Sequence, residues 1–296
     1  MMDFVICVDS TADMNADMRK EYGIEYFKMG FSGDDGEREA DLNWSDEQYS
    51  EFYNSMRAGK RYKTVQVPAA VFAKQMEEYL KAGFDILYIA CSSALSGSVN
   101  TAQMVAGELK AKYPERQVLC VDSLISTLAQ GALAIKASEM RAEGKYIEEV
   151  YAYIEENKMF CNYVSSVETL SYLKDAGRVS ATSSFFGNLF GVKPILVSNA
   201  LGQNEAVKKV KGRKAALAEI ADILARRITD AAGQVIYITH ADDYDAAKEL
   251  QSLIEERVEG AVIKIGFIGP IVGISVGPGT LIASYMGVDK SLPTVE

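Results

Sequence analysis

A cluster of hydroxyl side chains is the part of this sequence best suited to chemistry. Four serines, Ser92, Ser93, Ser96 and Ser98, fall within seven residues, with Gly97 among them. Hydroxyl groups donate hydrogen bonds, and the first N–H groups of a helix carry partial positive charge, so such a segment can bind an anion. An ordinary helix cap is the alternative, but one serine would be enough for it. The number of serines therefore favours an anion site.

The elements on either side of the serines predict how they are held. The apolar run Asp85–Ala90 is typical of a buried parallel strand, and Ala102–Tyr113 has helical spacing. In open α/β sheets, ligands bind at the carboxyl ends of the strands. The same order of strand, polar turn and helix follows Phe4–Val8 and Val118–Val121. We therefore expect residues 1–158 to form a parallel α/β domain that carries the serine loop of the anion site.

The second half of the chain has a different pattern. Cys161–Val167 reads as a strand, and Pro194–Val197 with Gln203–Val210 resembles an antiparallel pair. Strand and helix patterns then alternate towards the end of the chain. We expect residues 159–296 to form an α+β domain with a mixed sheet, so the predicted fold class is α/β with two domains.

Four local expectations can be checked against the structure. We expect one strand over Ile24–Phe31 and a helix that starts in Thr64–Pro68, where proline suits the first turn. Phe185–Phe190 predicts an aromatic helix that either packs in the core or lines an apolar tunnel. The glycine-rich segment Gly266–Gly279 is expected to close the fold.

Composition excludes several function classes. The net charge is −10 and the sequence pI about 4.9, whereas a nucleic-acid-binding protein normally has a basic balance. No apolar run approaches the ~18 residues that span a bilayer, and Met1–Asp9 reads as a first strand and not as a signal peptide. We expect a cytoplasmic protein without stable membrane insertion, which is compatible with transient contact with a membrane surface.

Cofactor motifs are missing from the sequence. The four cysteines are widely spaced with no CxxC pair, so zinc and dithiol chemistry have little support, and no P-loop or G-x-G-x-x-G follows a strand. We expect no cofactor.

A serine-hydrolase motif is matched only in part. Gly273–Gly277 matches G-x-S-x-G, but the only histidine, His240, precedes it, whereas that motif needs a later histidine. His240 itself is either a polar residue at a strand end or a site residue. The basic cluster Lys208–Lys214 is either a solvated surface or a docking patch for an acidic partner or a phosphate.

Short motifs spread over nearly the whole chain point to a family. They are, in order, Asp9-Ser10-Thr11-Ala12-Asp13, Thr64-x-Gln66, Ser92-Ser93-x-Leu95-Ser96-Gly97, Gly177-Arg178-Val179-Ser180, Lys193-Pro194-Ile195-Leu196 and Gly277-Pro278-Gly279. Together they resemble the DegV family of bacterial fatty-acid-binding proteins. The resemblance implies a two-domain fold that holds one long-chain fatty acid in a buried tunnel, closed by the second domain. It also implies a partner, a separate kinase subunit that uses ATP to make acyl phosphate, and no chemistry by this chain itself.

The resemblance also implies roles for individual residues. Thr64 and Ser96 match the threonine and serine that hydrogen-bond the carboxylate, and Ser93 belongs to the same motif as Ser96. Ser275 stands where the family has a histidine before the G-P-G turn, and we include it in the head-group site. Arg178 is expected at the mouth of the site or at the partner surface, and we place His240 with it.

The sequence departs from the family pattern in three places. Thr64-Val65-Gln66-Val67-Pro68 replaces the usual T-S-Q-P-S, Ala176 stands where a first glycine is common, and Ser275 replaces the histidine. Two alternatives therefore stay open. One is an enzyme acting on a small anionic substrate at the serine loop, with His240 as base; the other is a regulatory protein that binds a different amphiphile.

Overall fold

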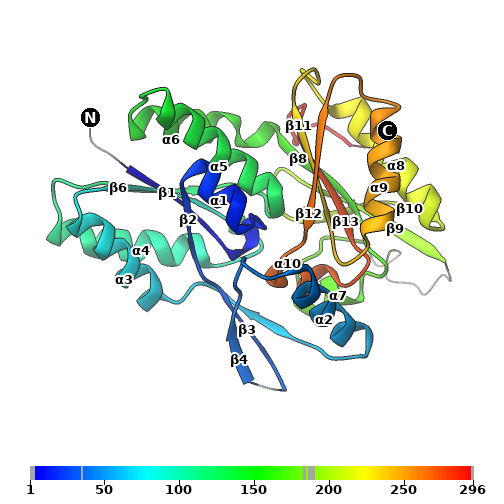
Figure 1. The fold of residues 1–296 in the computed structure, drawn as a ribbon, viewed down its shortest axis with the longest axis horizontal. Coiled ribbons are helices and arrows are strands. Elements are labelled where there is room, and N and C mark those ends of the chain that lie inside the picture. The colour runs from blue at the N-terminus through cyan, green and yellow to red at the C-terminus, as the bar shows by residue number, and fades with distance from the viewer. Residues whose placement is uncertain (1–3, 35, 183–184, 186–190, 295–296) are drawn as a thin grey trace. The chain divides into compact units, whose positions relative to one another are not determined.

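The chain folds into two compact units (Figure 1). The computed structural model describes residues 4–34, 36–182, 185 and 191–294. Unit 1 comprises Met1–Trp44 and Tyr62–Lys158, and unit 2 comprises Ser45–Arg61 and Met159–Glu296. Each unit has its own sheets, which we describe in turn.

Unit 1 is built on a parallel sheet, as the sequence predicts. Its strands run in the order β2-β1-β6-β7 and all pair in parallel. They are β1 (Phe4–Asp9), β2 (Ile24–Phe27), β6 (Asp85–Ala90) and β7 (Val118–Asp122). The helices are α1 (Ala16–Tyr22), α3 (Ala69–Lys81), α4 (Ser98–Lys112), α5 (Thr127–Ala142) and α6 (Ile147–Asn157), with the short 3₁₀ helices η1 (Ser10–Ala12) and η2 (Lys158–Phe160). In Figure 1, α3 and α4 lie on one side of this sheet and α5 and α6 on the other.

A second, antiparallel sheet in unit 1 corrects two local expectations. The single strand expected over Ile24–Phe31 is wrong, because the chain leaves the parallel sheet after β2 and forms β3 (Gly30–Gly33). At that point the Ser10 hydroxyl accepts the Met29 N–H (3.0 Å) and donates to the Ala40 carbonyl (2.8 Å), so Met29 bonds a side chain just beyond the end of β1 and not the β1 backbone. Strand β3 pairs with β4 (Gly36–Glu39) and with β5 (Lys63–Val65).

The helix expected to start within Thr64–Pro68 begins later. Thr64 lies in β5, opposite Phe31 of β3, and Pro68 is the N-cap residue of α3. Proline has no N–H to donate, so it is compatible with a helix start, but the β-branched Thr64 and Val65 take an extended backbone. This places the Thr64 side chain on a strand.

Unit 2 contains a mixed sheet of six strands, as expected. The order is β10-β9-β8-β13-β11-β12; β11 and β12 pair in parallel and the other neighbours are antiparallel. The strands are β8 (Cys161–Ser166), β9 (Val192–Ser198), β10 (Asn204–Lys211), β11 (Val235–His240), β12 (Val262–Phe267) and β13 (Leu281–Met286). The helices are α2 (Asp46–Arg57), α7 (Ser171–Ala176), α8 (Arg213–Arg227), α9 (Tyr244–Glu255) and α10 (Pro270–Val276). Apolar residues of α8 and α9 pack with those of β8, β9, β11 and β13 in one buried cluster.

Helix α2 is part of unit 2 although its sequence interrupts unit 1. Its buried Tyr49 stacks on Phe267, with ring centroids 4.5 Å apart, and the Tyr53 hydroxyl donates to the Ile268 carbonyl at 2.6 Å. Ser50 donates to a carboxylate oxygen of Asp242 at 2.7 Å. Both aromatic side chains come from the apolar face that helical spacing predicts for this segment.

The expected closing segment Gly266–Gly279 contains the end of β12, helix α10 and a turn. It leads into β13, a central strand of the sheet that the sequence analysis does not predict. The aromatic helix expected over Phe185–Phe190 lies outside the described residues, apart from Phe185, whose ring centroid is 5.1 Å from Lys209 Nζ.

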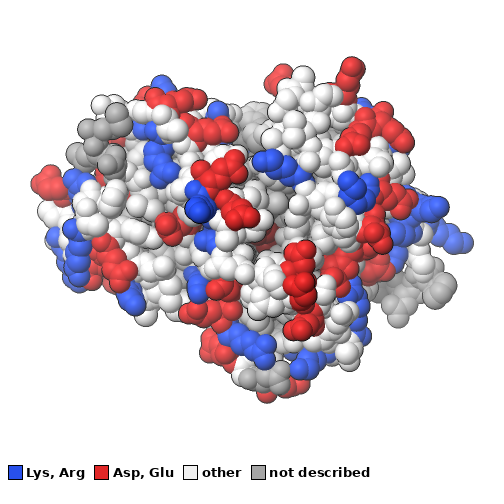
Figure 2. Space-filling view, in the orientation of Figure 1, with Lys and Arg blue, Asp and Glu red and all other residues white. Residues whose placement is uncertain are grey.

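Two further findings concern the described part of the chain. None of its helices combines the length and apolar character needed to cross a bilayer, and none of its His, Cys, Asp and Glu side chains form a group of three that could hold a metal ion. On the face drawn in Figure 2, acidic side chains stand among the basic ones throughout the described residues, so this face presents no continuous basic surface.

Candidate functional site

The serine segment of unit 1 lies where the sequence predicts, between the end of β6 and the start of α4. Ser92 and Ser98 are fully buried and Ser96 is 8 % exposed, whereas Ser93 is exposed. Gly97 is the N-cap residue of α4 and offers no side-chain cap. The Ser98 N–H, the first of this helix, donates to Ser96 Oγ (3.3 Å), and the N-cap residue itself caps none of the N–H groups that follow. A helix start with N–H groups left over favours an anion.

Side chains and backbone at the end of β7 hold the serine loop in place. The Ser92 N–H donates to the Ile125 carbonyl (2.9 Å), and the Ser93 N–H donates to Asp122 Oδ1 (3.0 Å). Leu124, between these acceptors, has a φ of +54°, a conformation that side chains other than glycine rarely adopt. The backbone of the serine loop is thus fixed by the end of β7 and the segment that follows it, while Ser93 remains exposed at the surface.

Thr64 and Ser96 lie on segments that the structure brings together. Gln66 donates through Nε2 to Thr101 Oγ1 (2.8 Å), and the Val67 N–H donates to Ser98 Oγ (3.2 Å), so the chain just after Thr64 is bonded to the first turn of α4. Thr64 is half-buried, and its hydroxyl has no hydrogen-bond partner among the described residues. It is therefore free to bind a ligand.

A buried carboxylate, that of Asp9, lies next to the serine loop, and the sequence alone shows it only as the first residue of a short motif. Asp9 is fully buried; its Oδ2 accepts the Tyr88 hydroxyl (2.7 Å) and the Cys91 N–H (3.0 Å), and its Oδ1 accepts the Thr11 N–H (3.0 Å). Burial, with the Asp9 charge as a second cause, raises the pKa of the Cys91 thiol far above its usual range. Cys91 is thus a protonated thiol and no nucleophile.

Ser275 lies in unit 2, in the last turn of α10, two residues before Gly277. It is half-buried, and its hydroxyl makes no hydrogen bond within the described ranges. A nucleophile elbow requires the serine in a turn between a strand and a helix, whereas Ser275 is inside a helix that a turn follows. The match to G-x-S-x-G therefore has no elbow geometry.

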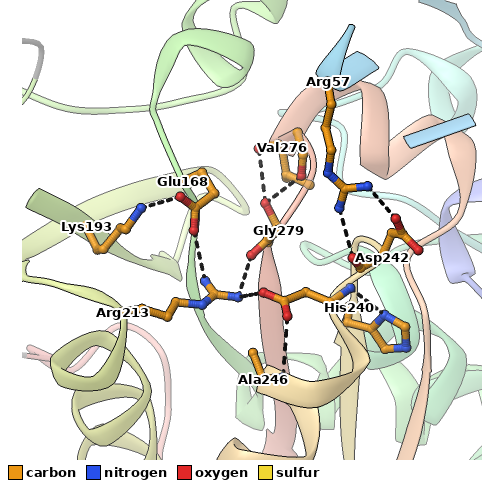
Figure 3. Close-up of polar contacts among 12 residues, drawn as sticks. Arg57, Glu168, Lys193, Arg213, His240, Asp242, Ala246, Val276 and Gly279 are labelled. Atoms are coloured by element: carbon orange, nitrogen blue, oxygen red, sulfur yellow. Dashed lines mark hydrogen bonds and ion pairs between the residues drawn. The ribbon is translucent and has the colours of Figure 1, made fainter. Parts of the chain in front are cut away.

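The turn after α10 is held by a network of charged side chains (Figure 3). Arg213 donates to the Gly279 carbonyl (2.7 Å) and forms ion pairs with Asp243 (2.5 Å) and Glu168 (3.5 Å). Lys193 forms a further ion pair with Glu168, whose side chain occupies the space that a Cβ of residue 279 would need. Nothing in the local sequence indicates this role of Arg213, because Lys208–Lys214 reads only as a basic cluster.

His240 is at the end of β11 and is only 2 % exposed. Its Nδ1 accepts the Asp243 N–H at 3.2 Å, and the centroids of the His240 and Phe267 rings are 4.4 Å apart (His240 is labelled in Figure 3). Burial lowers the pKa of His240, although nearby aspartates oppose this shift, so the ring is neutral at pH 7 with its proton on Nε2. A general base needs a free lone pair, and that of Nδ1 is already engaged.

The other predicted contact residues have simpler surroundings. Arg178 is exposed, follows α7, and donates to the Ala176 carbonyl at 2.5 Å. Within the basic cluster, Lys208 pairs with Glu219 at 2.7 Å. The cluster is thus partly neutralised by its own acidic neighbours.

Comparisons with known proteins agree over nearly the full length. The family model described as "Uncharacterised protein, DegV family" matches residues 3–286. A DegV domain-containing protein of Clostridium perfringens is 37% identical over 291 residues, 98% of this chain and 99% of that relative. A lipid-binding DegV protein from Thermotoga maritima has 27% identity and a TM-score of 0.86, with 98% of this chain and 100% of that chain covered. A DegV family protein from Thermus thermophilus, described by its fatty acid binding, has 26% identity and a TM-score of 0.86, with 96% and 100% covered.

Proposed function

This chain belongs to the DegV family, and we propose that it binds one long-chain fatty acid and presents the carboxylate to a separate kinase subunit that uses ATP. The ligand class is supported by the descriptions of the Thermotoga and Thermus proteins, which are similar to this chain over almost its whole length. The site is supported by the unbonded hydroxyl of Thr64, on a segment bonded to the helix start that follows Ser96. That juxtaposition is the observation on which the proposal depends.

In this proposal, Thr64 and Ser96 donate hydrogen bonds to the carboxylate, and the exposed Ser93 approaches it from the same loop. The amino end of α4, whose N-cap residue Gly97 has no side chain to cap it, adds partial positive charge. Hydroxyl donors suit an ionised head because a carboxylate accepts hydrogen bonds and donates none. They also offset the free-energy cost of removing the charge from water.

The acyl chain and the carboxylate contribute differently to the free energy of binding. Burying a CH₂ group stabilises a complex by about 0.8 kcal/mol, so a long acyl chain contributes roughly 10 kcal/mol before association costs. A hydrogen bond to a charged group contributes about 1.5–3 kcal/mol. The acyl chain therefore dominates affinity, while Thr64 and Ser96 fix the orientation of the head.

The remaining site residues take secondary roles in the proposal. The Ser275 hydroxyl is a further donor to the head, but a serine cannot exchange a proton near neutral pH as the histidine of the family pattern can. Arg178, which is exposed, suits contact with the kinase subunit. His240 is buried, so it supports the turn region and would reach a partner only indirectly.

Identification of co-purified lipid tests the proposed ligand. Native mass spectrometry of the purified protein should show an added mass equal to one long-chain fatty acid, and solvent extraction should release that acid. Protein that takes up no added palmitic acid after delipidation, yet turns over a small ester or acyl substrate, would support the enzyme alternative instead. The kinase role is tested separately, by whether acyl phosphate formation by an ATP-using fatty acid kinase subunit requires this chain.

A further inference from the structure

Two neighbouring serines at the start of α4 form a hydroxyl pair whose hydrogens can be assigned by counting donors and acceptors. Ser96 Oγ and Ser98 Oγ are 3.0 Å apart, so one of them donates to the other. Each oxygen also accepts a backbone N–H: Ser98 Oγ accepts that of Val67 (3.2 Å), and Ser96 Oγ accepts that of Ser98 (3.3 Å). Each hydroxyl has one hydrogen to place.

Burial decides the direction of the bond between the two hydroxyls. Ser98 is fully buried, and Ser96 Oγ is the acceptor that the described residues offer to its hydrogen. If Ser96 donated to Ser98, the Ser98 hydrogen would be buried without an acceptor, which is unfavourable. Ser98 therefore donates to Ser96. Ser96 Oγ then accepts two hydrogen bonds, and its own hydrogen is not used within the pair. Ser98 is fully buried, whereas Ser96 as a whole residue is 8 % exposed, so Ser96 is the member of the pair that a ligand can meet.

We propose that Ser98 is a positioning residue that fixes Ser96 as a hydrogen-bond donor and so makes the head-group site selective for an ionised carboxylate over a neutral head. This inference rests on the proposed fatty acid binding. With both acceptor sites of Ser96 Oγ already occupied, a ligand meets a donor there and no acceptor. A carboxylate, which only accepts, satisfies that requirement with a charged oxygen, whereas an alcohol accepts more weakly and brings a hydrogen of its own.

The same hydroxyl also connects the two halves of the head-group site. Through its bond to the Val67 N–H, Ser98 is tied to the segment that carries Thr64, and through its bond to Ser96 it is tied to the serine loop. The buried Ser98 side chain thus fixes the positions of Thr64 and Ser96 relative to each other, without touching the ligand.

The test compares palmitic acid with hexadecan-1-ol, which has the same chain length and a neutral head, in direct binding titrations. Wild-type protein should prefer the acid, and in Ser98→Ala the ratio of acid to alcohol affinity should fall about fivefold or more. Ser98→Thr, which keeps the hydroxyl, should retain the ratio. The matched control is Ser123→Ala: Ser123 is equally buried and bonds the backbone of the neighbouring loop, but has no bond to Ser96, so its loss should leave the ratio unchanged.

A double-mutant cycle separates positioning from general loss of structure. Ser96→Ala alone should lower the ratio, and adding Ser98→Ala should lower it no further. If Ser98→Ala does not fold, Ser98→Cys, which keeps the shape but donates weakly, replaces it. A ratio unchanged by Ser98→Ala or Ser98→Cys, or equally changed by Ser123→Ala, overturns the inference while fatty acid binding stands. A wild-type protein that binds neither ligand overturns the proposed function and this inference with it.

Discussion

The side-chain amide of Gln66 lies against Gly97, so a Cβ at position 97 would overlap Gln66 Oε1. Gly97 has a φ of −77°, which any residue adopts, so glycine is needed here for space and not for backbone freedom. The close approach of these two residues joins the segment of Thr64 to the start of α4.

Replacing Gly97 by alanine should therefore disturb the proposed site more than the fold. The added methyl pushes the exposed Gln66 aside and breaks its 2.8 Å hydrogen bond to Thr101. We expect fatty acid affinity to fall about three- to tenfold by titration calorimetry. In a Gln66→Ala background the same change should have little further effect; independent, additive losses would show that the contact does not act on the site.

Thr64→Val should weaken fatty acid binding about ten- to hundredfold without abolishing it, because the acyl chain supplies most of the affinity. Stability should change little, since the Thr64 hydroxyl has no partner among the described residues. Thr64→Ser keeps the donor and serves as the control. Equal affinities of wild type and Thr64→Val in a direct titration would remove Thr64 from the head-group site.

Gly273 in α10 faces the ring of Tyr53, which occupies the space that a Cβ would need. Because Tyr53 is fully buried and bonded to the Ile268 carbonyl, it cannot move away easily, and Gly273→Ala should lower the free energy of unfolding by about 1–3 kcal/mol. Gly107→Ala is the matched control: it is inside α4 with nothing within 4 Å of an added Cβ, and should stabilise by about 0.5–1 kcal/mol. Denaturant titrations that rank the two variants in the opposite order would contradict this packing.

His240, the only histidine, should make stability depend on pH. Burial lowers its pKa below the ordinary value of 6.5, against the opposing charges of Asp242 and Asp243. Below that pH the unfolded chain binds a proton that the folded protein excludes, so this contribution to stability is complete above about pH 6.5 and is lost as the pH falls towards the lower folded-state pKa. The advantage of wild type over His240→Asn in unfolding free energy should shrink from pH 8 to pH 5; an advantage that is constant with pH would contradict the lowered pKa.

Local signals in the sequence predicted the elements that carry the site. The apolar run before Ser92 forms β6, and the polar turn after it leads directly into α4. The antiparallel pair of β9 and β10 and the mixed sheet were also predicted. These features depend on residues close in sequence, whose spacing is visible without a structure.

Features that depend on distant residues were not predicted. Strand β2 ends early because Ser10 binds the backbone of Met29, and no periodicity reveals that bond. Strand β13 is missed because Ser284 interrupts its apolar run after Leu281–Ala283, so the segment shows neither a continuous apolar run nor a strict alternation. The relation of Gln66 to Gly97, 31 residues apart, and the buried Asp9 beneath the serine loop likewise appear only when the chain is folded.

The interruption of unit 1 by α2 has a practical consequence for dissecting this protein. Neither unit is encoded by one continuous stretch of the gene, because the second consists of Ser45–Arg61 together with Met159–Glu296. A fragment cut at Met159 would lack the ring that stacks on Phe267 and the hydroxyl that binds the Ile268 carbonyl. Expressing the second unit alone therefore calls for a grafted or permuted α2, and expressing the first alone calls for its replacement by a linker. A simple truncation at Met159 would measure the misplacement of that helix as much as the loss of the other unit.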